Sequence, residues 1–333
     1  MPRQAGKGKC PCCVLAGLWT ACREPWECNR HGLDAAAQDG QVSRPPKVSV
    51  IVPHYRDLAS LDLCLRALAV QTYPREDLEV IVADNASPEG EAAVAAAIAG
   101  RARLVIVPDK GAGPARNGGV ASARGDILAF TDCDCQPEPD WLAQGVLALE
   151  RFDVVGGRVK VLVHDPAAPT PTEAFERVFA FNNQAYVSKK GFTVTANLFC
   201  ARALFQKVGG FRVGVSEDLE WSHRARDAGF RIGYAAEAAV GHPARRTWPE
   251  LESKWRRLNS ETFALYAARR GGRLRWLLRS CALPVSALAH SPAVFTSGEL
   301  TGLGQRLAAL SVLYRLRFWR LADAFRLALG DGR

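Results

Sequence analysis

The stretch ILAFTDCDCQPEPDWL, Ile127 to Leu142, takes an apolar run abruptly into two carboxylates. Its first four residues, Ile127 to Phe130, follow turn residues and predict a short buried strand. Asp132 and Asp134 come directly after that strand, where carboxylates are costly unless a cation neutralises them. A divalent cation bridged to a phosphate would suit the pair. The other interpretation is a solvated turn, because Asp and Pro are common in turns.

The composition is that of a globular protein rather than a disordered one. The chain has 333 residues, of which 48% are hydrophobic and 23% are charged, with a net charge of +9. Residues 245–333 hold sixteen Lys and Arg but only six Asp and Glu, so the rest of the chain is close to neutral. This distribution disfavours nucleic acid as a partner of the main domain.

Targeting and membrane signals are weak. The apolar run Val14–Trp19 is too short for the core of a secretory signal, and no uninterrupted run of eighteen apolar residues occurs. The nearest approach, Leu277–Ala289, contains Arg279 and Pro284. We therefore expect a cytoplasmic protein, with the inner face of a membrane as a further, peripheral location.

The N-terminal residues 1–46 form a Cys-rich extension. Cys10 and Cys13 have C-x-x-C spacing, and Cys28 and His31 have C-x-x-H spacing, which together could ligate one zinc ion. A loosely ordered extension is the alternative, because further cysteines leave the ligand set ambiguous. We expect the main domain to span residues 47–246 and a basic helical region to span residues 247–333.

Short apolar segments alternate with helical patterns along the main domain. Strands are expected at 48–52, 78–83, 104–107, 127–130, 154–163 and 192–199, with helices at 60–71, 89–99 and 172–188, after Pro114 and from residue 217. This alternation predicts an α/β fold with a mostly parallel, open, Rossmann-like sheet flanked by helices. Ligands of such sheets bind beyond the carboxyl ends of the strands.

Polar residues gather at those predicted strand ends. They are His54, Tyr55 and Asp57 after the first strand, Asp84 and Asn85 after the second, and Asp132 and Asp134 after the fourth. The first strand is not followed by G-x-G-x-x-G, which disfavours a dinucleotide-binding domain. The glycine-rich segment Lys110–Pro114 and Arg116 could face a phosphate at a helix N-terminus, or could be a plain helix start.

Two further positions are candidates for chemistry. Glu217 and Asp218 follow Ser216 in the first turn of a predicted helix, where acids suit the helix dipole and where a general base could also stand. His242 ends a later predicted strand, and a lone histidine is more often structural than a ligand.

The order of these segments resembles glycosyltransferase family 2. The motifs are VSVIVPHYRD, VIVADNAS, GPARNGGVASARGDILAFTDCD, VGGFR, SEDLEWSHRARDAGFRIGY and VGHPARR, within residues 47–246. The resemblance implies a GT-A fold and an inverting transfer of sugar from a nucleotide donor. Its metal would be Mn²⁺ or Mg²⁺, which prefer carboxylate and phosphate oxygens.

The resemblance also implies roles for individual residues. Pro53, Tyr55, Asp84, Arg116 and Asp132 would bind the nucleotide, with Asp84 usually pairing with uracil; Asp134 and His242 would hold the metal; Asp218 would be the catalytic base; and Glu217 and Arg245 are secondary candidates. Cys135 departs from the family pattern. No Q-x-x-R-W motif follows the acidic pair, which predicts addition of one sugar per cycle rather than polymer synthesis.

The sequence does not identify the acceptor, and it leaves two alternative functions to consider. A glycan, a polysaccharide precursor or a lipid-linked molecule would serve as acceptor. The last helix carries an apolar stripe, Leu310, Tyr314, Phe318, Leu321, Phe325 and Leu329, with arginines on other faces. Such a helix can lie on an anionic membrane or pack on the domain. A sugar-phosphate nucleotidylyltransferase and an inactive membrane scaffold are the alternative functions.

Overall fold

The computed structural model describes residues 45–330. Internal contacts divide the chain into Met1–Pro45 and Pro46–Arg333, and only the second unit is described below. The predicted zinc ligands Cys10, Cys13, Cys28 and His31 lie outside the described residues, so the zinc hypothesis stays a prediction.

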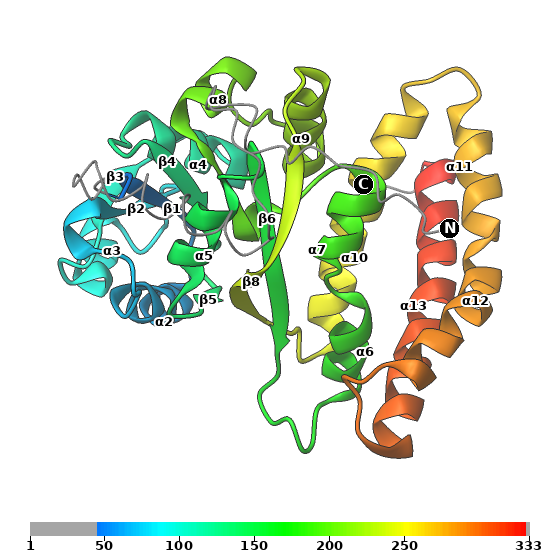
Figure 1. Ribbon diagram of the computed structural model, residues 1–333. Coiled ribbons are helices and arrows are strands. Elements are labelled where there is room, and N and C mark those ends of the chain that lie inside the picture. The colour runs from blue at the N-terminus through cyan, green and yellow to red at the C-terminus, as the bar shows by residue number, and fades with distance from the viewer. Residues whose placement is uncertain (1–44, 331–333) are drawn as a thin grey trace, which may run out of the picture. The chain divides into compact units, whose positions relative to one another are not determined.

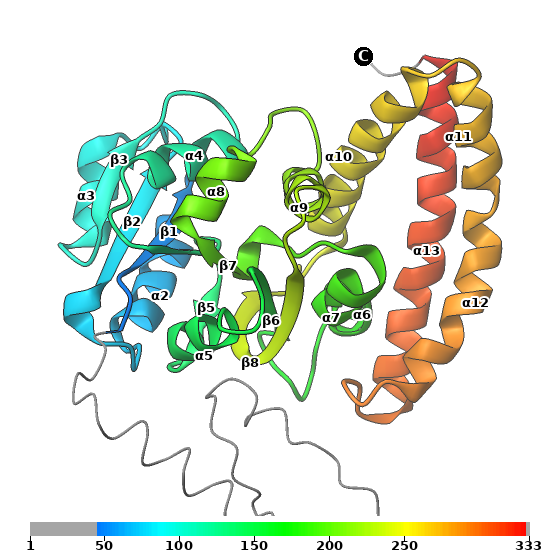
Figure 2. The same ribbon diagram turned by 45° about the horizontal axis from the view of Figure 1, so that its top comes forward.

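Eight strands of the described chain form one sheet, in the order β3-β2-β1-β4-β7-β6-β8-β5 (Figures 1 and 2). Their bounds are β1 Val48–His54, β2 Leu78–Asp84, β3 Arg103–Ile106, β4 Ile127–Phe130, β5 Gln136–Pro137, β6 Val154–Leu162, β7 Leu198–Ala201 and β8 Ile232–Pro243. β1 pairs in parallel with β2 and β4, β2 with β3, and β6 with β8. The α/β class with an open sheet is therefore confirmed.

The sheet is mixed because β7 runs antiparallel to both β4 and β6. The predicted strand at 192–199 was wrong over its first six residues, because β7 begins at Leu198. There the chain instead forms a short 3₁₀ turn, Thr195–Asn197. The side chain of Asn197 bonds to the backbone carbonyls of Arg158 and Ala238, and these bonds hold the turn against β6 and β8.

The described chain also contains the following helices. They are α2 Leu58–Ala69, α3 Glu91–Ile98, α4 Ala112–Ala121, α5 Trp141–Ala148, α6 Pro171–Phe179, α7 Asn183–Ala185, α8 Arg202–Val208, α9 Glu217–Asp227, α10 Trp248–Ala267, α11 Gly272–Cys281, α12 Leu283–Thr296 and α13 Gly302–Leu329.

The predicted single helix at 172–188 is wrong, because α6 ends at Phe179 and the chain restarts at α7. Two asparagines explain the break. Asn182 accepts a hydrogen bond from the amide of Ala185 as an N-cap, and Asn183 donates to the carbonyl of Gly157 on β6. Such side-chain bonds to the backbone compete with a continuous helix.

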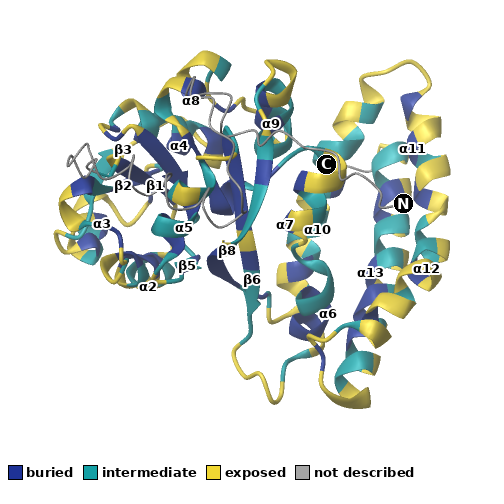
Figure 3. Cartoon of the chain, viewed as in Figure 1, coloured by how far each residue is buried: buried dark blue, intermediate teal, exposed yellow. Residues whose placement is uncertain are grey.

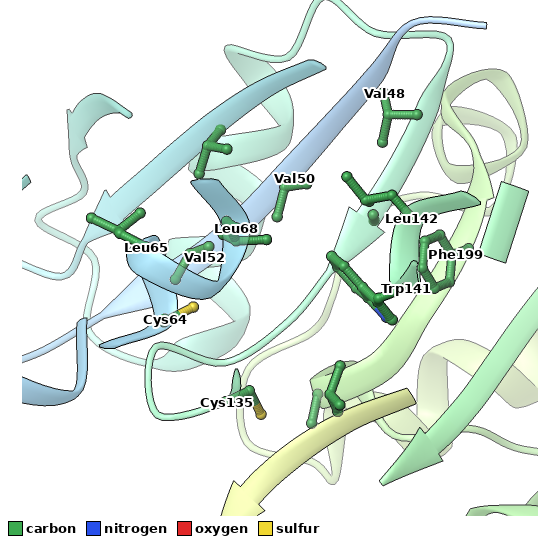
Figure 4. Close-up of a cluster of buried hydrophobic side chains, with 14 of the residues drawn as sticks. Val48, Val50, Val52, Cys64, Leu65, Leu68, Cys135, Trp141, Leu142 and Phe199 are labelled. Atoms are coloured by element: carbon green, nitrogen blue, oxygen red, sulfur yellow. The ribbon is translucent and has the colours of Figure 1, made fainter. Parts of the chain in front are cut away.

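Strand alternation sorts the core into two layers. Val48, Val50 and Val52 of β1 point to the side covered by α2, α3 and α5, whereas Ile51 points to the side covered by α4, α8 and α9. Figure 4 shows the first layer, where Trp141 packs beside Phe199 of β7. Helices therefore cover both faces of the sheet, which leaves the strand ends as the place for polar chemistry.

A separate apolar cluster joins α6, α10, α12 and α13. α13 buries Val312, Leu313 and Leu316 there, so this helix is packed on the protein. Leu310 and Tyr314 of the apolar stripe predicted from its sequence pack against this cluster, whereas its members Phe318 and Leu329 are 56% and 77% exposed. Within residues 45–330, no helix combines the length and the apolarity that a membrane crossing requires.

Candidate active site

The strand directions bring several loops to one edge of the sheet. β1, β2 and β4 are parallel, so His54, Asp84 and the segment after Phe130 lie at the same edge. β7 is antiparallel to both β4 and β6, which makes β6 and its parallel neighbour β8 run in the direction of β4. The end of β8, with His242, therefore shares this edge with Asp132 and Asp134.

Asp84 is held by a small buried network at the end of β2. Its Oδ1 accepts hydrogen bonds from His54 Nδ1 at 2.7 Å and from the Ser87 hydroxyl at 2.6 Å, and its Oδ2 accepts from the Ser87 amide at 2.9 Å. Burial raises the pKa of Asp84, but the bonds from Ser87 and His54 outweigh it and hold that pKa below its ordinary value. The carboxylate is thus ionised and fixed in orientation.

Arg116 joins the two acidic motifs of the site. This buried side chain projects from α4, and its guanidinium binds Asp132 Oδ1 at 2.5 Å and also pairs with Glu217 at the start of α9. Gly113 permits the approach, because a β-carbon there would lie 2.8 Å from Glu217 Oε2. Burial alone would lower the pKa of Arg116, yet the two carboxylates raise it above its ordinary value. Burial raises the pKa of Glu217, and Arg116 opposes that rise.

Asp134 faces His242 across the site. Asp134 Oδ2 lies 3.5 Å from His242 Nε2, while His242 Nδ1 lies 2.8 Å from the carbonyl oxygen of Pro243. A carbonyl only accepts, so Nδ1 donates to Pro243 and Nε2 is the ring nitrogen that faces Asp134. Burial raises the pKa of Asp134. A carboxylate oxygen and an imidazole nitrogen that face each other in this way suit a shared cation.

Asp132, Asp134 and Cys135 also form a group whose potential ligand atoms lie within 4.8 Å of one another. The residues present therefore fit a divalent cation. Asp134 and His242 are the better donors, because one oxygen of Asp132 already binds Arg116. Carboxylate and imidazole suit Mn²⁺ well, and carboxylate suits Mg²⁺.

Cys135 belongs to the core rather than to the open site. It is fully buried in the same apolar cluster as Cys64, and the two side chains lie on neighbouring segments in Figure 4. Burial raises the pKa of both thiols, so they stay protonated. The Cys64 thiol also contacts the carbonyl oxygen of Asp132 at 3.6 Å. The departure from the family pattern is thus explained as a small apolar residue that anchors the acidic loop.

The remaining predicted site residues differ in their surroundings. Pro53 is buried within β1, whereas Tyr55 is half exposed beside the guanidinium of Arg56. Asp218 is half-buried, and its carboxylate accepts a bond from the Ser216 hydroxyl at 3.3 Å. Arg245 is not paired with Asp134, because its Nη1 binds Glu176 at 3.0 Å.

Sequence patterns did not reveal two of these partners. Glu176 is buried on α6 and pairs with both Arg245 and Lys254, although a glutamate in an amphipathic helix suggests a solvent-facing side chain. The sequence did not single out Ser87, because serine is common in turns. The signal that could have found it is its spacing: Ser87 lies three residues after Asp84, as in an Asx-type turn.

Comparisons with known proteins agree with this geometry. The family model described as "Glycosyl transferase family 2" matches residues 49–209. Glycosyltransferase AglE of Haloferax volcanii is 33% identical over 65% of this chain and 73% of its own length. Validoxylamine A glucosyltransferase of Streptomyces hygroscopicus subsp. limoneus is 34% identical over 69% of this chain and 59% of its own length.

Among solved structures, mannosyltransferase PcManGT from Pyrobaculum calidifontis, in complex with GDP-Man and Mn²⁺, superposes with a TM-score of 0.55. It is 21% identical, and the match covers 92% of this chain and 95% of that one, so this likeness shows the GT-A fold. With the fold, the acidic motifs and the relatives in agreement, this chain belongs to glycosyltransferase family 2 and is a glycosyltransferase.

Proposed function

We propose that this protein transfers a single sugar, with inversion, from a UDP-linked donor to an acceptor hydroxyl in a metal-dependent reaction. The observation that carries the proposal is the pair of Asp134 and His242, whose Oδ2 and Nε2 atoms face each other 3.5 Å apart beside Asp132. Residues 47–246 would form the transferase domain, and residues 247–333 would form the helical region that packs on it.

The hydrogen bonds of Asp84 support a uracil base. A carboxylate oxygen has two acceptor positions, and Oδ1 already accepts from His54 and Ser87. Oδ2 accepts one bond from the Ser87 amide, which leaves it one position. Uracil offers a single ring N–H between two carbonyls, whereas guanine offers two adjacent donors that need both oxygens. Asp84 therefore suits uracil better than guanine.

The acidic edge supports binding of the diphosphate. Asp134 and His242 would hold the cation, with Asp132 adjacent. The cation would stabilise the negative charge that grows on the leaving nucleotide. Arg116 orients Asp132 through their 2.5 Å contact. Pro53 and Tyr55 stand at the end of β1, where they would border the nucleoside.

Asp218 is the better candidate for the general base. Glu217 Oε1 pairs with the guanidinium of Arg116, so this carboxylate is already engaged. Asp218, by contrast, is held by the neutral hydroxyl of Ser216 and keeps a carboxylate oxygen for an acceptor proton. A base on α9 and a cation site on the β4 loop would place proton removal and leaving-group departure on different loops. An in-line attack with inversion needs that separation.

Calorimetry with UDP and GDP, each with and without Mn²⁺, tests the donor and metal together. We expect UDP to bind about tenfold more tightly than GDP, which corresponds to one charged hydrogen bond. Binding should need Mn²⁺ and should be lost in Asp134→Asn. Asp227→Asn is the matched control, because this exposed acid lies at the far end of α9.

Transfer itself is tested by incubating the protein with a panel of UDP-sugars and sugar acceptors. The anomeric proton coupling in the first product, measured by NMR, should show inversion, and chains longer than one added sugar should be absent. Nucleotide binding without release of UDP from any donor would favour an inactive homologue and would refute the proposed transfer.

We also propose that the C-terminal helices meet an anionic membrane at the inner, cytoplasmic face, where a lipid-linked acceptor would be reached. Much of the outer surface of α11 and α12 is exposed (Figure 3), including Leu278 and Val285, which are 65% and 66% exposed. Together with the local excess of arginine, this surface is typical of interfacial helices. Sedimentation with anionic vesicles should fall in a Leu278→Ser/Val285→Ser variant, and unchanged sedimentation would contradict the contact.

A further inference from the structure

The C-terminal helices contain a cluster of positively charged side chains, remote in the fold from the acidic edge of the sheet. A small opening of about 20 Å³ lies between α10, α11 and α13. Its lining residues are Asn259, Trp276, Arg279, Ser280, Leu283 and Arg320. The space holds one water-sized group.

Two arginines, Arg279 and Arg320, line this opening. Arg320 donates from Nε to Asn259 Oδ1 at 3.1 Å, and its guanidinium carbon lies 4.0 Å from the ring centre of Trp255. Burial, reinforced by repulsion from Arg317 and Arg279, lowers the pKa of Arg320 to about 9. Nε of Arg317 is itself buried without a hydrogen-bond partner.

Asp323 is the acidic side chain that counters Arg320, but other groups already occupy it. Its Oδ1 accepts from Arg326 at 2.8 Å and lies 3.7 Å from Arg256, while its Oδ2 accepts from Asn259 at 3.0 Å. Asp323 thus neutralises Arg326 and Arg256 at least as much as Arg320. Positive charges gathered in this way repel one another, and an anion would offset that repulsion.

We propose that this opening binds a phosphoryl group through Arg279 and Arg320. One phosphate oxygen fits the opening beside the hydroxyl of Ser280, and the rest of the group stays at the mouth, where Arg279 is exposed. A planar guanidinium matches phosphate geometry with two parallel hydrogen bonds. The site is independent of the proposed transfer reaction.

The phosphoryl group could belong to a membrane lipid or to a soluble anion. Leu274 and Leu278 flank Arg279 on α11 and are 62% and 65% exposed, which suits acyl chains or the lipid interface next to a headgroup. The two sources share the same phosphate chemistry, so separate arms of one experiment distinguish them.

The first arm titrates inorganic phosphate into the full-length protein without added divalent cations, at constant ionic strength against chloride. Phosphate should raise the Tm, as a ligand of the folded state does. Arg279→Gln should weaken the apparent affinity about tenfold, the loss of one charge-assisted hydrogen bond. Ser280→Ala should weaken it less, and Arg273→Gln, an exposed arginine of the same helix outside the opening, should leave it unchanged.

The second arm measures sedimentation with vesicles of phosphatidylcholine alone or with phosphatidylglycerol added. Binding to the anionic vesicles that depends on Arg279 but not on Arg273 identifies a lipid headgroup, whereas a response to inorganic phosphate alone identifies a soluble anion. Equal effects of Arg279→Gln and Arg273→Gln in both arms would overturn the proposal, because they indicate diffuse surface charge. Loss of phosphate binding in Asp134→Asn would overturn it too, because the phosphate would then occupy the transferase site.

Discussion

Replacement of Arg116 by methionine tests how the acidic edge is held together. The substitution keeps an unbranched side chain but removes the cation that Asp132 and Glu217 share. Breaking a buried ion pair from one side typically costs 3–5 kcal/mol, because a charge is left uncompensated. The two carboxylates are 29% and 23% exposed and are partly hydrated, so we expect the lower end, about 3 kcal/mol.

The loss should depend on pH in a defined direction. Burial already raises the pKa of Glu217, and Arg116 opposes that rise, so Arg116→Met should raise this pKa further. An acid with a raised pKa in the folded state destabilises the fold when ionised, and stability returns as the pH falls through that pKa. The loss of unfolding free energy in Arg116→Met should therefore be smaller at pH 5 than at pH 8. Adding Glu217→Gln should recover part of that loss at pH 8.

The assay is urea unfolding of the nucleotide-free protein, followed by tryptophan fluorescence, at both pH values. Arg231→Met is the control, because Arg231 is an exposed partner of Asp153 and its loss should leave the midpoint nearly unchanged. A loss of unfolding free energy below about 1 kcal/mol, or a loss that is equal at both pH values, would refute the view that Arg116 neutralises the carboxylates of Asp132 and Glu217.

Three further predictions address the core and the chemistry. Asn197→Ala should reduce the free energy of unfolding in urea by about 3 kcal/mol, because the indole N–H of Trp141 and two backbone carbonyls lose their partner; a change under 1 kcal/mol would contradict this role. Gly145→Ala should lower stability by about 1–3 kcal/mol, since its β-carbon would lie 2.2 Å from the ring of Phe199, and an unchanged Tm would show that α5 can shift. Asp218→Asn should lower kcat for UDP release by about 10²–10⁴-fold while UDP binding in calorimetry stays unchanged, and full activity would exclude Asp218 as the base.

Much of the fold was readable from local sequence. Apolar segments of four to seven residues bounded by turn residues located β1, β2 and β4 to within two residues, because buried strands need side chains of that kind on both faces. The order of short motifs along the chain indicated the family. Asp84, Asp132 and Asp134 could be proposed as site residues because polar residues at the end of a buried strand are conspicuous.

Contacts between distant residues were decided only by the tertiary structure. Arg116 meets Glu217 across 101 positions, and His242 meets Asp134 where β8 pairs with β5, which begins two residues after Asp134. No local pattern encodes such distances, because a side chain takes partners through space and periodicity reports only the face of its own element. The antiparallel direction of β7, the break after α6 and the burial of Cys135 arise in the same way. The sequence by itself determined which strands form and where their acids lie, whereas packing decided which cation each acid faces.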